Sequence, residues 1–242
     1  MRDADNNFNL AMNFTTFTIS KTYSNFIVLS TNVEYDTLNE AVANSNNDDT
    51  IYIKTGTYAN TGIVISNKTL DIIALDGAIF DAQGRDANFI TVNENAIADI
   101  SGITFRGLHN RNTNYGAIVN HGYLSLYSCN FTDNKITKTS FAGNGGAAIF
   151  SDGYSLEIEN CNFINNKVNG FNGGAIYVDG ESSVKNCNFA NNTATKGDGG
   201  AFWIRVGIVE NCKFNNNKVN GFNGGAFYVD GDLTIKNSNF AN

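Results

Sequence analysis

The sequence NNKVNGFNGGAIYVDG (residues 165–180) recurs as NNKVNGFNGGAFYVDG (residues 216–231), with fifteen of sixteen positions identical at an offset of 51 residues. A half-period copy lies between them. Gly-Gly-Ala begins at Gly145, Gly173, Gly199 and Gly224. The tetrapeptide F-x-x-N ends at Asn134, Asn166, Asn192 and Asn217, at steps of 32, 26 and 25 residues against 28, 26 and 25 for Gly-Gly-Ala. A repeat of about 26 residues with several landmarks in register indicates a repeat architecture.

One repeat contains two short β-prone runs, GGAIYV and SSVKNCNF, with a turn at Asp179-Gly180 and a polar loop at the end. The repeats have no 3.6-residue periodicity and no leucine ladder, which excludes helical and leucine-rich repeats. Short strands between Gly, Asn and Asp turns are typical of one coil of a parallel β-helix. We therefore expect an all-β parallel β-helix, or solenoid.

Charged residues alternate in sign from repeat to repeat, as stacking predicts. Equivalent residues of neighbouring coils lie about 4.8 Å apart, so like charges in one column would repel. One column reads Glu159, Lys185, Glu210 and Lys236, and a second reads Asp179, Arg205 and Asp230. We interpret both columns as surface ladders rather than catalytic groups.

The unusual content of asparagine, glycine and proline also follows from the stacking of coils. The chain holds 41 asparagines and 24 glycines but no proline. A further column contains Asn160, Asn186, Asn211 and Asn237, with Ser128 in the first repeat. Asparagine tolerates left-handed turns and its amide can bond the amides above and below, whereas proline would remove a ladder donor. We expect left-handed corners and amide stacking at this column.

The four cysteines also fall in one column, where Ser238 replaces the fifth: Cys129, Cys161, Cys187 and Cys212. A disulfide or a metal site is the functional alternative. The spacing of the cysteines is the repeat period, no C-x-x-C or His pair is present, and stacked parallel Cβ vectors suit a disulfide poorly. We expect buried free thiols that pack against the phenylalanine column, with no metal and no cofactor.

Composition excludes several classes of protein. With 42% hydrophobic and 12% aromatic residues, the chain can bury enough surface to fold. No uncharged apolar run approaches the roughly 18 residues of a transmembrane helix. With 23 acidic and 16 basic residues, the net charge of −7 gives no reason to expect nucleic-acid binding.

The domain organisation follows from where the repeats begin. Residues 1–32 read as an N-terminal cap or linker, and residues 33–242 read as the β-helix. Within it, residues 33–110 form irregular first coils and residues 111–242 form the repeat coils. Thr37 and Glu40 make a capping box for a short amphipathic helix through Leu38, Ala41 and Val42, which would cap the open core. The last repeat stops inside its F-x-x-N motif, which predicts truncation.

Two segments carry a resemblance to known proteins. YDTLNEAVANSNNDDTIYIKTGTY with ISNKTLDIIALDGAIFDAQG resembles the opening coils of pectate-lyase-like right-handed β-helix proteins. The GGA(I/F) and F-x-x-N motifs resemble repeats of chlamydial polymorphic outer-membrane proteins, and the combination is most similar to adhesin-like surface proteins of methanogenic archaea. The resemblance implies a right-handed β-helix at the cell surface or outside the cell that attaches to a glycan or protein of a host or partner cell. The sequence has no recognisable export signal or anchor.

The GGA strand offers a candidate binding surface. Its outward column is either Val119, Phe150, Tyr177, Trp203 and Tyr228 or the Ile118, Ile149, Ile176, Phe202 and Phe227 column. Both are apolar, so periodicity does not decide between them. If the second column points inward, Phe150, Tyr177, Trp203 and Tyr228 form an aromatic stripe suited to sugar rings or protein partners. The alternative is that this column is core or is covered by a loop.

A carbohydrate-active enzyme, either a polysaccharide lyase or a glycoside hydrolase, is the second functional hypothesis. It requires carboxylates that converge on one sugar bond. Asp152, Asp179, Arg205 and Asp230 instead fall at ladder spacing. We read His121 as a solvated loop residue, and we name no catalytic residue.

Overall fold

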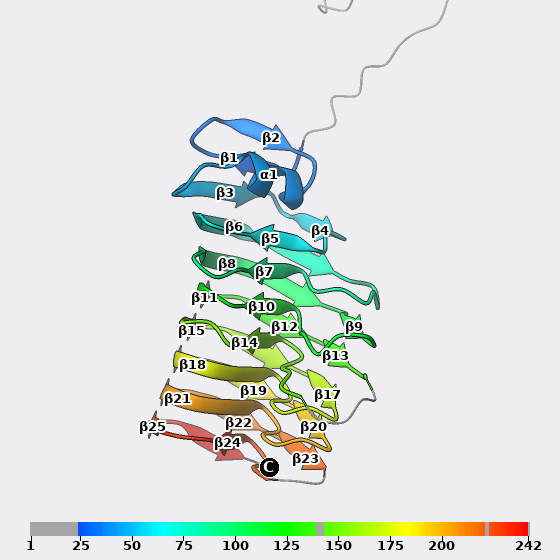
Figure 1. Ribbon diagram of the computed structural model, residues 1–242, viewed down its shortest axis with the longest axis vertical. Coiled ribbons are helices and arrows are strands. Elements are labelled where there is room, and N and C mark those ends of the chain that lie inside the picture. The colour runs from blue at the N-terminus through cyan, green and yellow to red at the C-terminus, as the bar shows by residue number, and fades with distance from the viewer. Residues whose placement is uncertain (1–23, 139–142, 221–222, 242) are drawn as a thin grey trace, which may run out of the picture.

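The computed structural model describes residues 24–138, 143–220 and 223–241. The strands stack in parallel into a β-solenoid of about seven turns, with the N-terminal coils at one end and the C-terminal coils at the other (Figure 1). The predicted all-β parallel solenoid is confirmed. Of the predicted cap or linker at residues 1–32, residues 1–23 lie outside the described part.

Residues 24–110 contain nine strands and the helix α1 (Leu38–Asn44). The strands are β1 (Phe26–Val28), β2 (Val33–Tyr35), β3 (Asp49–Ile53), β4 (Gly56–Tyr58), β5 (Ile63–Ile65), β6 (Thr69–Asp81), β7 (Ile90–Val92), β8 (Ile97–Arg106) and β9 (His109–Asn110).

The described residues of the repeat coils form seventeen strands in a regular order. These are β10 (Ile118–Asn120), β11 (Tyr123–Tyr127), β12 (Asn130–Thr132), β13 (Lys135–Ile136), β14 (Ile149–Ser151), β15 (Ser155–Glu159), β16 (Asn162–Ile164), β17 (Lys167–Asn169), β18 (Ile176–Lys185), β19 (Asn188–Ala190), β20 (Thr193–Thr195), β21 (Phe202–Glu210), β22 (Lys213–Asn215), β23 (Lys218–Asn220), β24 (Phe227–Val229), β25 (Leu233–Lys236) and β26 (Asn239–Ala241).

The N-terminal end of the solenoid is capped as the sequence predicts. The Thr37 hydroxyl accepts from the Glu40 N–H and the Glu40 carboxylate accepts from the Thr37 N–H, which begins α1 with a capping box. Leu38, Ala41 and Val42 are buried and belong to the main core. Strand β1 pairs antiparallel with both β2 and β3, so the cap also interrupts the parallel order.

Two glycine-containing corners of the first coils lie inside strands. Asp76-Gly77 lies inside β6, where the register with β8 shifts between Ile73 and Ala78. Gly102 lies inside β8 with φ +74°, and a Cβ there would collide with the Ala74 carbonyl oxygen. Both strands therefore bend without ending, because glycine takes up the positive φ at the corner.

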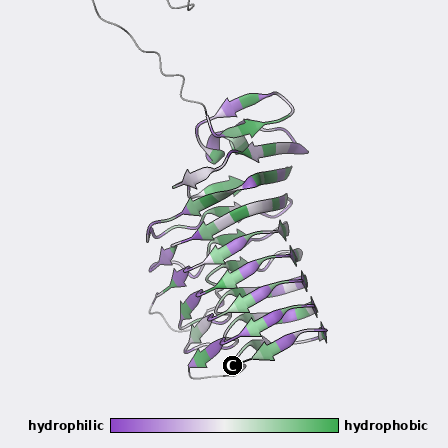
Figure 2. Ribbon diagram, turned by 180° about the vertical axis from the view of Figure 1, so that it is seen from behind, coloured by the Kyte–Doolittle hydropathy of each residue, from purple (hydrophilic) through white to green (hydrophobic). Residues whose placement is uncertain are grey.

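Side-chain columns fill the repeat coils. Phe131, Phe163, Phe189 and Phe214 stack at centroid separations of 5.0, 4.7 and 4.7 Å, with rings within 7° of parallel. The cross-strand register confirms the alternating column of Glu159, Lys185, Glu210 and Lys236, and the ion pair between Arg205 and Asp179 supports the second column. Viewed from behind, apolar and polar residues alternate along the strands (Figure 2). The main core is thus a stack of similar layers.

A buried amide ladder runs through the F-x-x-N asparagines. The Nδ2 of Asn134 donates to Oδ1 of Asn166, the Nδ2 of Asn166 donates to Oδ1 of Asn192, and Asn192 bonds Asn217 in the same way, at 2.9–3.1 Å. Each Oδ1 also accepts the backbone N–H of the preceding rung, and each Nδ2 donates to a phenylalanine carbonyl one coil back. Every buried amide in the ladder interior is therefore fully bonded.

The asparagine column predicted from composition has a different role. Asn160, Asn186, Asn211 and Asn237 have φ between 46° and 56°, and Ser128 has φ 53°. The left-handed corners are confirmed. Amide stacking, however, occurs at the F-x-x-N column, because those side chains are buried where their donors need partners.

Candidate functional site

The predicted aromatic column lies on the outer side of the GGA strands. Ile118, Ile149, Ile176 and Phe202 belong to the main core, so the neighbouring residues point away from it. Phe150, Tyr177 and Trp203 stack at 5.4 and 4.4 Å, and Tyr228 continues the stack. The structure therefore decides which column is inward.

The aromatic column is nevertheless buried. Phe150 and Trp203 are 7% exposed and Tyr177 is 2% exposed; these residues form an apolar cluster of their own with Val119, and only Tyr228 is partly exposed. Burial and the negative charges of Asp179 and Asp152 raise the pKa of the Tyr177 hydroxyl. Of the two alternatives, the buried column therefore holds for Phe150, Tyr177 and Trp203, whose stacked rings cover one another.

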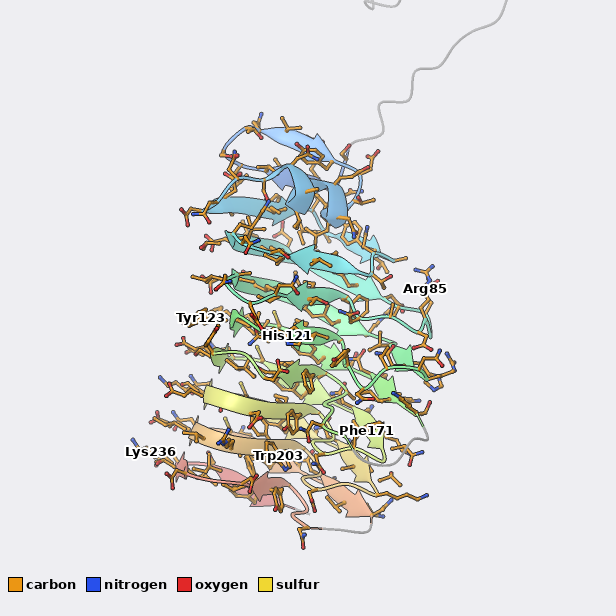
Figure 3. The ribbon with its side chains drawn as sticks, viewed as in Figure 1. Arg85, His121, Tyr123, Phe171, Trp203 and Lys236 are labelled. Atoms are coloured by element: carbon orange, nitrogen blue, oxygen red, sulfur yellow. The ribbon has the colours of Figure 1, made fainter. Side chains whose placement is uncertain are left out.

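A polar column runs beside the aromatic one on the same face. It follows the strand ends and reads Ser66, Asn93, His121, Asp152, Asp179, Arg205 and Asp230. Asp152 Oδ1 lies 2.5 Å from Nδ1 of His121, and Arg205 pairs with Asp179 at 3.2 Å. His121, which the sequence suggested to be solvated, is therefore held by a carboxylate. His121 and Trp203 both lie on the front face in Figure 3.

An open cavity of about 440 Å³ occupies this face in the first coils. It is lined by Ser66, Asn67, Asn93, Glu94 and His121. The Asn93 Nδ2 donates to the Ser66 hydroxyl at 2.7 Å, which links two coils of the wall. Amide, hydroxyl, carboxylate and imidazole groups from three successive coils thus face one hollow.

These polar groups lie together because β5 and β7 end at paired residues, Ile65 and Val92. The apolar triplets of β5 and β7 are followed by Ser66-Asn67 and Asn93-Glu94. Asn67 has φ 54°, a turn conformation that asparagine tolerates. Ser66-Asn67 and Asn93-Glu94 therefore occupy equivalent corners of two stacked coils.

A buried hydrogen-bond network holds the loop that carries His121. The Asn120 Nδ2 donates to the Ser151 hydroxyl at 3.0 Å and to the Ser155 carbonyl at 3.2 Å, and the Gly122 N–H donates to Asn120 Oδ1. Asn120 and Ser151 are fully buried. The Asn120 network thus holds the backbone on both sides of His121, and Asp152 holds its imidazole ring. A side chain held in this way favours a defined contact with a ligand.

Exposed tyrosines form a second feature on the adjacent wall. Tyr123 and Tyr154 stack at 5.2 Å and are 44% and 56% exposed. A hollow of about 120 Å³ beside Tyr127 is lined by Ser125, Leu126, Tyr127, Glu157, Ile158, Glu159, Ser183 and Lys185. Exposed rings on this molecule thus occur outside the column that the sequence singled out.

The cysteine column is buried and free of disulfides. The N–H of Cys129, Cys161 and Cys187 each donates to the sulfur of the next coil at 3.3–3.4 Å, and the Cys212 N–H donates to the Ser238 hydroxyl. Hydrogen bonds with Cys129 and Cys187, together with burial, raise the pKa of the Cys161 thiol. The predicted packing role is confirmed.

The carboxylates of the polar column do not converge. Asp152, Asp179 and Asp230 lie one per coil, with Arg205 between the last two. Within residues 24–138, 143–220 and 223–241, no three His, Cys, Asp or Glu side chains are arranged to hold a metal ion. This geometry differs from the paired carboxylates that glycoside hydrolysis uses.

Sequence reasoning missed the cavity because it concentrated on the repeat coils. The available signal was a polar dipeptide directly after an apolar triplet, in Ser66-Asn67 and again in Asn93-Glu94. These residues belong to no repeat, so their stacking was not visible until the register was known.

Comparison with known proteins returned no matching family model, no similar curated protein and no similar solved structure. Among the residues that the structure describes, no helix is both long enough and apolar enough to cross a membrane.

Proposed function

We propose that the protein is an attachment segment of an extracellular or cell-surface protein, similar to the adhesin-like proteins of methanogenic archaea, and that it binds a glycan of a partner cell. The lateral face formed by β5, β7 and β10 supplies the binding site. The solenoid acts as the stalk that presents this face.

The cavity of about 440 Å³ carries the proposal. Its volume is within the range of small-ligand sites, and its lining can donate and accept hydrogen bonds at several points. Val64 lies on β5, the strand that leads directly into Ser66, and its side chain is 51% exposed. It adds an apolar contact for a sugar ring. A hydroxyl-rich ligand of low charge fits this combination better than an apolar one.

The second candidate is a carbohydrate-active enzyme at the same cavity. The specific observation is that Glu94 and His121 line one hollow and that Asp152 orients the imidazole. An oriented imidazole near a carboxylate is one arrangement used for proton transfer. The cavity lining contains a single carboxylate, so attachment remains the primary proposal.

The test compares Glu94→Gln/His121→Gln with the wild-type chain on a glycan array, followed by titration calorimetry of the best-binding glycan. We expect the double variant to weaken binding at least about tenfold, because it removes a charged acceptor and the oriented imidazole. Glu181→Gln, an exposed change on the adjacent wall, is the matched control and should leave the affinity unchanged.

Equal glycan binding by the wild type and the double variant would overturn the proposal. Release of reducing ends or unsaturated products by the wild type, with loss of that release in Glu94→Gln, would favour the enzyme instead.

A further inference from the structure

The five short strands β9, β13, β17, β20 and β23 form a parallel sheet along one edge of the solenoid, the right-hand edge in Figure 1. The register aligns one outward column, which reads His109, Lys135, Lys167, Thr193 and Lys218. The lysines in it are exposed, while the residues that follow them, Ile136 and Val168, are buried. The column therefore points to solvent.

The lysine stripe, defined as Lys135, Lys167 and Lys218, carries a single sign of charge. In the column of Glu159, Lys185, Glu210 and Lys236 the stacked charges alternate in sign instead. Here Lys135 is the direct cross-strand partner of Lys167, about 4.8 Å away along the axis. Like charges so placed repel, and the chain as a whole carries net charge −7. The four ion pairs among the described residues include none of these three lysines.

The surroundings increase the positive potential at the N-terminal end of the stripe. Nη2 of Arg111 lies 2.8 Å from Nδ1 of His109, and Lys135 follows His109 in the column. Burial and the positive charges of Arg111 and Lys135 lower the pKa of His109, although Asp86 opposes them. The local charge is thus positive on an acidic molecule.

We propose that the lysine stripe binds a linear anionic polysaccharide, carboxylated or sulfated, laid along the solenoid axis. An external row of anions removes the repulsion within the stripe and neutralises lysines that lack an ion-pair partner within the described chain. This site lies on a different sheet from the cavity and does not depend on the function proposed for it.

The neighbouring column favours a polysaccharide over other linear polyanions. Two residues beyond the lysine column, on the same face of the strands, the register aligns Asn169, Thr195 and Asn220. The side-chain amides of Asn169 and Asn220, which are partly exposed and exposed respectively, suit sugar hydroxyls. Single-stranded nucleic acids are bound on aromatic platforms, and the two columns hold no Phe, Tyr or Trp.

The experiment measures binding of the full chain to heparin, polygalacturonate, neutral dextran and oligo-dT by titration calorimetry at two salt concentrations. The test variant is Lys135→Gln/Lys167→Gln/Lys218→Gln. The control, Lys185→Gln/Arg205→Gln/Lys236→Gln, removes the same charge from the alternating columns. We expect the test variant to lose at least about tenfold in affinity for an anionic polysaccharide and to show a weaker salt dependence, whereas the control changes by less than about twofold.

Three results would overturn the proposal: equal losses in both variants, retained binding in the test variant, or binding of oligo-dT or dextran as tight as that of the anionic polysaccharides. Thermal unfolding at low salt provides an independent check of folding and of the premise. The midpoint of unfolding should rise in the test variant, because repulsion between the lysines is removed, and fall in the control, because favourable charge pairs are lost. A fall in the test variant would show that the lysines do not repel one another in the folded protein, which contradicts the premise. Glu94→Gln/His121→Gln should bind the polyanion normally.

Discussion

The first coils and the repeat coils solve the same stacking problem in different ways. In residues 33–110, strands of unequal length bend at β6 and β8, and few identical side chains stack. In the repeat coils, phenylalanine, cysteine, asparagine and outer aromatic columns each continue from coil to coil. The open cavity of about 440 Å³ lies at the irregular end, with His121 as its only lining residue from the repeat coils.

This difference teaches that regularity and recognition compete along the chain. A column of identical residues satisfies its own hydrogen bonds and contacts, which leaves few groups directed at a ligand. Where the column is broken, as at Ser66, Asn93 and His121, unlike polar groups meet at one corner and leave room between them. The predictions below test the contrast in stability between the two regions.

The largest effect is expected at the amide ladder. Asn166→Ala removes one hydrogen bond each from the Asn134 Nδ2, the Asn134 N–H, the Asn192 Oδ1 and the Phe131 carbonyl in a fully buried site. At roughly 1–3 kcal/mol for each unpaired buried group, we expect a loss of about 4 kcal/mol or more in the free energy of unfolding. Urea denaturation followed by circular dichroism measures it.

Asn93→Ala is the counterpart in the first coils. It removes the 2.7 Å hydrogen bond to the Ser66 hydroxyl at an open site, so we expect a loss of about 1 kcal/mol. Equal losses in the two variants would contradict the contrast between the regions.

The outer aromatic column should be the next most sensitive site. Trp203→Ala removes a ring that is 7% exposed and stacks 4.4 Å from Tyr177, so we expect about 3 kcal/mol of destabilisation. Val64, at the equivalent position of the first coils, is exposed, and Val64→Ala should change stability by less than about 0.5 kcal/mol. Thermal unfolding of both variants measures the difference. An unchanged midpoint in Trp203→Ala would mean that the aromatic column is exposed to solvent.

Glycine positions provide a third comparison. A Cβ on Gly174 would collide with the carbonyl oxygen of Gly200 in the next coil, so Gly174→Ala should destabilise the protein by about 2 kcal/mol. Gly62 in the first coils has φ +70° and no atom near its Cβ position, so Gly62→Ala should cost about 1 kcal/mol from backbone strain alone. Chemical denaturation measures both losses. A larger loss in Gly62→Ala than in Gly174→Ala would mean that neighbouring coils can move apart to accept a methyl group at Gly174.

The smallest effect concerns acid sensitivity in the first coils. Hydrogen bonds from Ser30 and from the Asn46 N–H lower the pKa of Asp49 below its usual range. The unfolded chain then binds the proton more readily, so this stabilisation is present above about pH 4 and is lost as the pH falls through the lowered pKa.

We expect Asp49→Asn to cost less than about 1 kcal/mol at pH 7 and to reduce the further loss between pH 7 and pH 3. Asp232→Asn, an exposed change in the repeat coils, should leave that pH difference as in the wild type. Equilibrium denaturation at the two pH values makes the comparison, and an unaltered pH difference in Asp49→Asn would contradict the assignment.

Sequence alone predicted the strand register in the parts of the molecule that repeat. The Gly-Gly-Ala and F-x-x-N spacings predicted the parallel register that pairs Phe163 with Phe189, and the capping box predicted α1 from Thr37. Continuous bending at Gly102 was not predictable, because glycine within a strand and glycine at a turn have the same local signature.

The candidate site was less predictable for physical reasons. The aromatic column at Tyr177 was identified as outward but not as buried, since periodicity reports direction and not what surrounds a side chain. The His121–Asp152 contact depends on a register between residues 31 apart in the chain. Neither fact is encoded in local spacing.

The asparagine ladder has a consequence for how such a chain can change its length. Each rung donates toward the C-terminal coil and accepts from the N-terminal one, so every interior coil presents the same two faces. Adding or removing a pair of coils, 51 residues, leaves every amide junction alike and keeps the alternation of charge in the Glu159 column. Recombination between the near-identical repeats of the gene could therefore lengthen or shorten the protein in steps of two coils, about 9.6 Å, and reach could be selected without redesign of the fold.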